Sequence, residues 1–315
     1  MRRCAVLLMG PTGAGKSDLA LRLVERFPLE IVSVDSALVY RHMDIGTAKP
    51  SAAVRARIKH HLIDIRDPAE RYSVGEFVRD ARLAMDDIWS RGLQPLLVGG
   101  TMLYFHALSA GLADLPEANL QVRAEIDAAA AVDGWAALHR TLAEVDPDAA
   151  ARIHSNDAQR IQRALEVYRT TGRAITHLQR ERHTMLEDVN LLEIALIPGE
   201  RSLLHAQIGA RFKTMMGQGL LDEVRALYMR GDLTGEHPAM RAVGYRQIWE
   251  YLAGMSTLEG AQQKAIAATR QLAKRQLTWL RRRSRAESFD CMHPHVAGFL
   301  FDALSQGIFA EWSKV

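Results

Sequence analysis

The chain lacks most of the features that mark specialised classes of protein. It has only two cysteines, Cys4 and Cys291, among 315 residues and no C-x-x-C pair, so we expect neither a disulfide framework nor a zinc site. The apolar stretch near its N-terminus is too short for a signal peptide or a membrane span. It also has no internal repeat and no low-complexity segment. We therefore expect a cytoplasmic enzyme without membrane contact.

A strong overall charge is missing as well. The formal net charge is +3, so the field of the whole molecule does not predict a nucleic-acid partner. The 33 arginines against 7 lysines are compatible with genome base composition or with phosphate ligands. The charge is local: residues 270–285 hold seven basic side chains and no acidic one. On a helix expected over Leu258–Arg285, a stripe of Arg270, Lys274, Arg281 and Arg285 favours contact with nucleic-acid phosphates over a solvated face.

What the chain does contain is a phosphate-binding loop near its start. Residues Gly10-Pro11-Thr12-Gly13-Ala14-Gly15-Lys16-Ser17 fit the pattern G-x-x-x-x-G-K-[ST]. An apolar run precedes the loop and a helical pattern follows it. Glycines let the backbone wrap closely around an anion, and N–H groups converge on that anion at a helix N-terminus. We expect Lys16 to add a positive charge and the Ser17 hydroxyl to bind the accompanying Mg²⁺.

The first third of the chain alternates strand and helix patterns. Strands are expected at Ala5–Met9, Ile31–Val34, His61–Ile65 and Pro95–Val98. This alternation predicts an α/β fold in which helices flank a P-loop NTPase-like parallel sheet. Ligands of such sheets bind at the carboxyl ends of the strands. Asp35, Asp64 and Thr101 lie at or just past three of these ends, so we expect them to converge beside the phosphate-binding loop.

From about Leu115 the pattern changes. Strand-like runs disappear until Leu191, and helices are expected instead. We therefore divide the chain into a P-loop catalytic core of residues 1–114 and 188–315 and an all-helical insertion of residues 115–187. Within the insertion, Ile161 and Leu165 are expected on the core-facing side of a helix over Ala158–Thr171.

Several segments resemble the bacterial tRNA dimethylallyltransferases. Besides the loop at Gly10–Ser17, they are Val32–Tyr40, Met43–Pro50, His60–Ile65, Val98–Tyr104, Gln159–Glu166 and Arg241–Gln247. The likeness runs in order from residue 4 to about residue 285, and its most specific parts are Asp35-Ser36-Ala37-Leu38 and Gly46-Thr47-Ala48-Lys49-Pro50. Gly13-Ala14 replaces the family's frequent Ala-Ser at variable positions of the loop, so anion binding is expected to survive.

The resemblance implies transfer of a dimethylallyl group from dimethylallyl diphosphate to N6 of adenosine 37, in tRNAs that read codons beginning with U. The products would be N6-dimethylallyladenosine and diphosphate. The loop then holds a diphosphate leaving group, whose growing charge the backbone N–H groups, Lys16 and Mg²⁺ would stabilise. Arg211 lies in a segment that also resembles the family and is expected to contact the diphosphate, the alternative being a surface arginine.

The nucleophile implied by the resemblance is an exocyclic amine, which needs positioning and a proton acceptor. Asp35 is the candidate base, and the alternatives for it are a ligand of Mg²⁺-bound water or a helix cap. Thr101 is expected to hydrogen-bond the adenine or the candidate catalytic base, Asp35. Ser36, Ala37 and Leu38 are expected to line the pocket.

A His-His-x-x-Asp set at His60, His61 and Asp64 suggests a metal site at first sight. Adjacent residues of a strand point to opposite faces, however, so the two histidines are not expected to share a ligand. We interpret these residues, together with Asp44, as structural or at the edge of the pocket.

The resemblance also assigns contacts with the tRNA anticodon stem-loop, whose target base must leave its stack to reach a buried carboxylate. These residues are Asp35, Ser36, Ala37, Leu38, Thr101, Arg123, Gln159, Arg160, Ile161, Gln162, Arg163, Met240, Arg241, Ala242, Val243, Gly244, Tyr245 and the segment Ala273–Leu280 with Lys274 and Arg275, followed by Arg281.

Two other functions are compatible with the loop and the fold. A small-molecule or nucleotide kinase would use ATP as its donor, and an RNA-binding NTPase would hydrolyse ATP without group transfer. Nothing in the sequence indicates an oligomer, so we expect a monomer.

Overall fold

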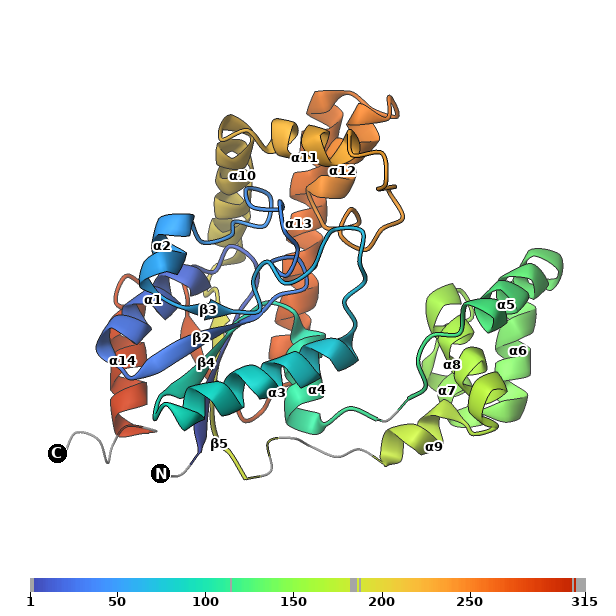
Figure 1. Ribbon diagram of the computed structural model, residues 1–315, viewed down its shortest axis with the longest axis horizontal. Helices are drawn as coiled ribbons and strands as arrows, with labels where there is room; N and C mark the ends of the chain where they lie inside the picture. The colour runs from blue at the N-terminus through green and yellow to red at the C-terminus, as the bar shows by residue number, and fades with distance from the viewer. Residues whose placement is uncertain (1–2, 114, 182–185, 187, 308, 310–315) are drawn as a thin grey trace. The chain divides into compact units, whose positions relative to one another are not determined.

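The computed structural model describes residues 3–113, 115–181, 186, 188–307 and 309. Two compact units make up the chain (Figure 1). The core unit comprises Met1–His106 and Glu187–Val315, and the helical unit comprises Ala107–Leu186. Asp114 and Glu187, at the boundaries expected from the sequence, lie outside the described residues.

A parallel sheet forms the centre of the core unit. Its strands are β1 (Cys4–Met9), β2 (Leu29–Val34), β3 (His60–His61), β4 (Gln94–Gly99), β5 (Asn190–Ile197) and β6 (Glu287–Asp290). They pair in the order β3-β2-β4-β1-β5-β6, with every pair parallel. All strands therefore end at the same edge of the sheet, and the predicted fold class is confirmed.

Helices cover both faces of this sheet (Figure 1). On one face, α1 (Lys16–Arg26) and α14 (Val296–Gln306) pack together through buried residues such as Leu23 and Leu300. On the other face lie α3 (Val74–Ser90) and part of α13 (Leu258–Leu280). A capping box begins α3, since the Ser73 hydroxyl accepts the Glu76 N–H and the Glu76 carboxylate accepts the Ser73 N–H.

A second apolar core lies beyond the carboxyl edge of the strands. It is formed by α10 (Arg201–Gly217), α11 (Leu220–Tyr228), α12 (Tyr245–Leu252) and the first part of α13. Val39, Tyr40 and Met43, from the segment that follows β2, are buried in the same core. This packing fixes the segment after β2 against helices that come much later in the chain.

The helical unit contains α5 (Leu120–Asp133), α6 (Trp135–Val145), α7 (Pro147–Arg152), α8 (Ala158–Thr171) and α9 (Ile175–Arg180). Its core includes Ile126 and Leu142 together with Ile161 and Leu165 of α8. The expectation that Ile161 and Leu165 face the core is therefore confirmed. The short helices α7 and α9 were not expected, because six residues give too little periodicity to recognise.

Two of the expected secondary-structure elements in the core unit have wrong bounds. The long basic helix ends at Leu280 rather than Arg285, and the chain then forms β6, whose sequence Glu-Ser-Phe-Asp has no apolar run. The strand expected at His61–Ile65 stops after His61, since Leu62 and Asp64 adopt left-handed backbone angles with φ of 63° and 58°. The residue composition of these two segments does not indicate where the helix and the strand end.

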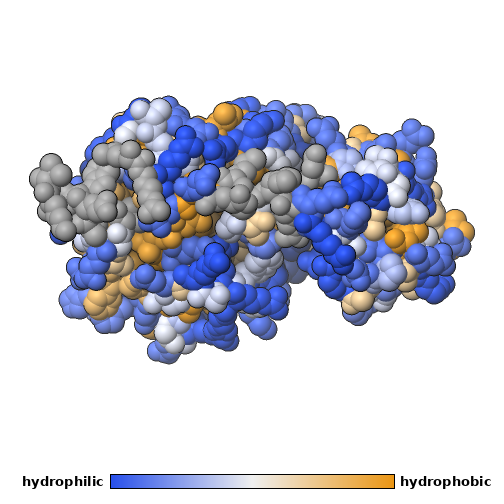
Figure 2. All heavy atoms as spheres, turned by 90° about the horizontal axis from the view of Figure 1, so that it is seen from below, coloured by the Kyte–Doolittle hydropathy of each residue, from blue (hydrophilic) through white to orange (hydrophobic). Residues whose placement is uncertain are grey.

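Hydrophilic side chains cover most of the face shown in Figure 2. Among the described residues, no helix combines the length and the apolar character that a membrane crossing requires.

Candidate active site

The phosphate-binding loop connects β1 to α1 at the carboxyl edge of the sheet. Gly13 and Gly15 take left-handed backbone angles, with φ of 84° and 71°, which side chains other than glycine rarely adopt. Gly15 is the N-cap of α1, so Lys16 and Ser17 form the first turn of that helix. The loop therefore leads into a helix N-terminus, whose N–H groups and positive dipole end favour the binding of an anion.

The Lys16 side chain folds back along this loop. Its ammonium group donates hydrogen bonds to the carbonyl oxygens of Gly10, at 2.9 Å, and Pro11, at 2.7 Å. Burial lowers the pKa of Lys16 to about 8, although the nearby Asp35 carboxylate acts in the opposite direction. A buried ammonium with a lowered pKa gains from any anion that binds beside it.

Asp35 follows the last residue of β2 and is half-buried. Its Oδ1 accepts hydrogen bonds from the backbone N–H groups of Ala37, at 2.8 Å, and Leu38, at 3.3 Å. The neighbouring turn is held in place by Thr101, whose hydroxyl accepts the Ser36 N–H at 3.1 Å and whose own N–H donates to the Val34 carbonyl. The carboxylate is thus fixed by the backbone around it.

A cavity of about 740 Å³ joins these groups. Among the residues that the sequence singled out, those lining it are Thr12, Lys16, Ser17, Asp35, Ser36, Ala37, Leu38, Thr101, Arg211, Arg241, Ala242, Val243, Gly244, Tyr245 and Arg275. The convergence expected for Asp35 and Thr101 beside the loop is present. Gly100, Gln276 and Trp279 also line the cavity.

Arg211, on α10, is half-buried in the wall of this cavity rather than at the surface. Burial lowers the pKa of its guanidinium, and the Asp35 carboxylate opposes that shift. Arg211 also contributes to the lowered pKa of Lys16, so the three charged groups act on one another across the cavity. Arg241 and Arg275 line the cavity as well, so its basic side chains outnumber its two carboxylates, Asp18 and Asp35, and the site has a local excess of positive charge.

Asp64 does not lie with Lys16, Asp35 and Arg211 in the cavity. Its carboxylate is bound by Lys49 and Arg55, each at 2.5 Å, and it does not line the cavity. The Lys49 ammonium also reaches Asp44, at 2.6 Å, and the carbonyl of Tyr40. The expectation that Asp64 converges beside the loop is wrong because these ion pairs hold it in the turn after β3. The structural interpretation of Asp44 and Asp64 fits this network.

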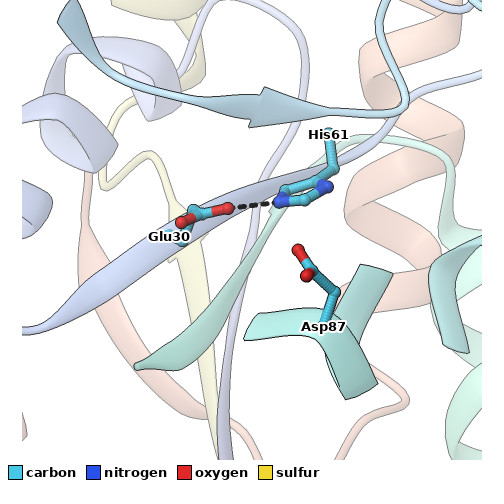
Figure 3. Close-up of side chains that lie close together, drawn as sticks. All are labelled: Glu30, His61 and Asp87. Atoms are coloured by element: carbon cyan, nitrogen blue, oxygen red, sulfur yellow. Dashed lines mark hydrogen bonds and ion pairs between the residues drawn. The ribbon is translucent and has the colours of Figure 1, made fainter. Parts of the chain in front are cut away.

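The two adjacent histidines have different surroundings, as expected from the alternation of side chains along a strand. His60 lines the cavity, whereas the His61 ring contacts Glu30 of β2 on the opposite side (Figure 3). Glu30, His61 and Asp87 lie close enough together to suggest a metal site. Arg91, however, binds both oxygens of Glu30, at 2.6 and 2.8 Å, and also Asp87 at 2.9 Å. Burial alone would raise the pKa of Glu30, but Arg91 and His61 hold it at about 2. This cluster is a neutralised ion-pair network.

Tyr245, at the start of α12, is fully buried although it lines the cavity. Its hydroxyl contacts Glu223, whose carboxylate also accepts the backbone N–H groups of Asp44, Ile45 and Gly46 at 2.9, 2.7 and 3.1 Å. Burial raises the pKa of Tyr245, and Glu223 raises it further. Glu223 thus holds the loop after β2 in the cavity wall. Nothing in the sequence distinguishes it from an ordinary helical glutamate.

The remaining residues assigned to tRNA lie outside this cavity. Lys274 and Arg281 are exposed, and Met240 is fully buried in the apolar core beyond the strands. The expected basic stripe is broken, since α13 ends at Leu280 and Arg281 is its C-cap. Arg283, which was not part of the stripe, forms a two-point ion pair with Glu193 at 2.8 and 2.9 Å. Arg285 is therefore not on the helix that carries Arg270 and Lys274.

In the helical unit, the assigned residues have different surroundings. Gln159 and Arg160 are exposed, Gln162 donates to Asp127, and Ile161 is fully buried. Arg123 and Arg163 both bind Glu166, whose side chain has no exposed surface. Burial would raise the pKa of Glu166, but the hydrogen bonds from the two arginines outweigh it and keep the pKa below its usual value.

Together, the fold and the cavity define a P-loop enzyme in which a cationic anion-binding loop faces a carboxylate held by the next strand. The model of the IPP transferase family matches residues 38–283. The chain belongs to this family. It is 56% identical to a tRNA dimethylallyltransferase of Halorhodospira halophila, covering 93% of this chain and 97% of the relative. It is 54% identical to that of Methylobacillus flagellatus, covering 96% of each.

Two solved structures are also similar to the chain. One is the full-length tRNA isopentenylpyrophosphate transferase of Bacillus halodurans, at 36% identity and a TM-score of 0.68, covering 98% of this chain and 99% of that one. The other is a eukaryotic dimethylallyltransferase acting on tRNA, at 26% identity and a TM-score of 0.83, covering 98% of this chain and 80% of that one.

Proposed function

We propose that this protein transfers the dimethylallyl group of dimethylallyl diphosphate to N6 of adenosine 37 in tRNAs that read codons beginning with U. One observation carries the chemistry: Asp35 faces Lys16 and Arg211 across a single cavity. This arrangement puts a proton acceptor beside a cationic anion-binding loop. The relatives described as tRNA dimethylallyltransferases support the choice of donor and acceptor, and neither a kinase nor an RNA-dependent NTPase is favoured by them.

The loop would bind the diphosphate of the donor. As the allylic C1–O bond breaks, its electron pair leaves with the diphosphate, and negative charge grows on that group. The N–H groups at the start of α1, the Lys16 ammonium and the Arg211 guanidinium are placed to stabilise this charge. Interactions that strengthen as charge develops lower the barrier, whereas equal binding of donor and transition state does not.

Mg²⁺ fits the oxygen donors in this cavity. The Ser17 hydroxyl and the Asp35 carboxylate both line it, and hydroxyl, carboxylate and phosphate oxygens are the ligands that Mg²⁺ prefers. When bound with the diphosphate, the ion would neutralise part of its charge. The Glu30 network is not an alternative site, because Arg91 and Lys59 already pair with the carboxylates of Glu30 and Asp87.

On the acceptor side, the N6 lone pair would form the new bond to C1, and Asp35 would take the proton that N6 releases. The amine becomes acidic only as the new bond forms, so a carboxylate can accept its proton at that point. Thr101, which already orients the Ser36 N–H, would hydrogen-bond the adenine or Asp35. Ser36, Ala37 and Leu38 would form the wall against which the base lies.

The adenosine would reach Asp35 only after leaving the stack of the anticodon loop. Arg241, Val243 and Arg275 line the cavity and are placed to contact the backbone of an entering nucleotide. The exposed Lys274 and Arg281 would bind phosphates further along the RNA. We assign the helical unit, through the exposed Gln159 and Arg160, to the anticodon stem-loop.

Radiolabelled dimethylallyl diphosphate, incubated with this protein, Mg²⁺ and unmodified tRNA but no nucleotide, tests the proposal. We expect label in the RNA fraction, and digestion should show it on N6 of the adenosine next to the anticodon. A tRNA carrying guanosine at that position is the matched control. Label that stays outside the RNA, or product formation that requires ATP, would overturn the proposal.

A further inference from the structure

Gln276 is a buried polar residue that the proposed chemistry leaves without a role. It lies on α13, with 8% of its surface exposed, between the buried Ala273 and Leu277 and the exposed Arg275. The resemblance placed the whole segment Ala273–Leu280 against tRNA. Gln276 instead points into the protein, toward the turn that ends β4 and toward the phosphate-binding loop.

Both ends of its amide are hydrogen-bonded. Oε1 accepts the backbone N–H of Thr12, at 2.9 Å, and Nε2 donates to the carbonyl of Gly100, at 2.8 Å. Thr12 belongs to the phosphate-binding loop, and Gly100 directly precedes Thr101. A backbone N–H can only donate and a carbonyl can only accept, so the orientation of the amide is fixed by its partners.

These bonds span a gap that the sheet does not close. The last registered pair between β1 and β4 is Met9 with Gly99, after which the two backbones leave the sheet in different loops. One loop carries Lys16 for the leaving group. The other carries Thr101, which holds the turn at Asp35 through the Ser36 N–H. The amide of Gln276 is therefore a direct link between the two halves of the reaction centre.

The fit is tight on the Gly100 side. A Cβ added at Gly100 would lie 2.5 Å from Nε2 of Gln276, whereas its next neighbour, the Gly10 carbonyl, would be 3.4 Å away. Any side chain at position 100 would therefore push the amide away from its place. A glycine at this position is explained by Gln276 rather than by an unusual backbone angle.

We propose that Gln276 is a positioning residue that sets the separation between the diphosphate-binding loop and the Thr101–Asp35 side of the cavity. The inference rests on the proposed function. Displacement of a leaving group requires nucleophile, carbon and leaving oxygen in line, and a shift of about 1 Å in such an arrangement costs roughly 100-fold in rate. Gln276 touches neither substrate in this role and acts through Thr12 and Gly100.

Gln276→Ala and Gln276→Glu test the inference. Alanine removes both hydrogen bonds, and we expect kcat to fall roughly 10- to 100-fold while the KM for tRNA changes by less than about threefold. Gln271→Ala, on the exposed side of the same helix, is the matched control and should behave as wild type. An unchanged kcat for Gln276→Ala, or a lower melting temperature with normal kcat per folded molecule, would overturn the inference.

The glutamate variant supplies a signature that a merely structural residue would not give. Its carboxylate keeps the acceptor for the Thr12 N–H but places a second acceptor against the Gly100 carbonyl. Once protonated, the same group again donates to Gly100 and accepts from Thr12, as the amide does. The ratio of wild-type to variant kcat should therefore shrink at least threefold between pH 8 and pH 6. A ratio independent of pH counts against the inference. This experiment with the glutamate variant remains informative even if the alanine variant does not fold.

A double-mutant cycle checks the contact itself. Gly100→Ala alone should lower kcat, because its Cβ displaces the amide, but should cost little more in the Gln276→Ala background, where that space is free. Additive effects would contradict the contact.

Binding of Mg²⁺–diphosphate, measured by calorimetry, needs no turnover, and Gln276→Glu should weaken it about tenfold at pH 8, because a carboxylate is added beside the anion site. If wild type transfers no label but this difference appears, only the proposed function fails. If wild type transfers label and the variants match it in rate and binding, only the inference fails.

Discussion

The core unit and the helical unit use their arginines in different ways. In the core unit, Arg211 and Lys16 face Asp35 across a cavity that Asp18 also lines. In the helical unit, Arg123 and Arg163 share the buried Glu166, which also accepts the Asn119 N–H at 2.7 Å. In both places two cations interact with a carboxylate, and the first set lines a cavity of about 740 Å³.

The difference shows that a cluster of charges is informative only together with its surroundings. Glu166 has no exposed surface, and four hydrogen bonds from three residues satisfy both of its oxygens, so the cluster joins α5 to α8. Asp35 uses Oδ1 for local backbone N–H groups, and its cations belong to other elements that approach from across the cavity. The first arrangement stabilises a fold, and the second is suited to binding and releasing an anion.

The largest effect should come from Asp35. Asp35→Asn keeps the size of the side chain and an acceptor oxygen for the Ala37 N–H but removes the proton acceptor. We expect transfer to fall by about 10²- to 10⁴-fold. Binding of tRNA, measured by filter retention, should stay within about threefold of wild type. An equal loss of binding and transfer would show that Asp35 holds the RNA or the loop rather than the proton.

Glu166→Gln should instead affect stability. It leaves two half-buried guanidinium groups without their counter-charge, at a cost of about 3 kcal/mol in the free energy of unfolding. Calorimetry of the whole chain checks the shift. Arg160→Gln is the control, since its ion pair with Asp157 is exposed and should be worth less than about 1 kcal/mol. Loss of transfer with unchanged stability would mean that Glu166 belongs to a binding site.

Lys16 should make diphosphate binding depend on pH. Burial lowers its pKa to about 8 in the free protein, and a bound anion raises that pKa. Above pH 8, binding must therefore be accompanied by uptake of a proton, so affinity falls as pH rises, by about tenfold between pH 7 and pH 9. Lys16→Arg stays charged over this range, so its pH dependence reports the ionisation of diphosphate itself. The same slope of affinity against pH in both proteins would exclude Lys16 as the source of the pH dependence.

The smallest effect should come from the exposed cations at the end of α13. Lys274→Gln and Arg281→Gln should each weaken tRNA binding a few-fold and reduce the slope of log affinity against log salt by about one. Arg283→Gln should act differently, by destabilising the fold, because its guanidinium binds Glu193 at 2.8 Å. Unchanged salt dependence would make Lys274 and Arg281 merely solvated.

Much of the core unit was predictable because its signals are local. The phosphate-binding loop is a contiguous pattern, and the central strands are apolar runs. Asp35 directly follows β2, and Thr101 lies two residues after β4. β6 and the left-handed turn at Leu62 and Asp64 were not predictable in the same way. A short polar strand at the edge of a sheet and a turn held by ion pairs both depend on residues outside their own segment.

The sequence by itself determined where an anion binds, which strand ends face it and which family the motifs resemble. Only the tertiary structure decided which charges remain available for a ligand. Arg163 and Arg283 look no different in sequence from Arg160 and Arg281, yet each of the first two is held by at least two hydrogen bonds, one or more of them to a glutamate. Gln276 is hydrogen-bonded to Thr12, which is 264 positions away in the sequence, and to Gly100, which is 176 positions away. Contacts of this kind arise from how helices pack onto a sheet, and no local pattern encodes them.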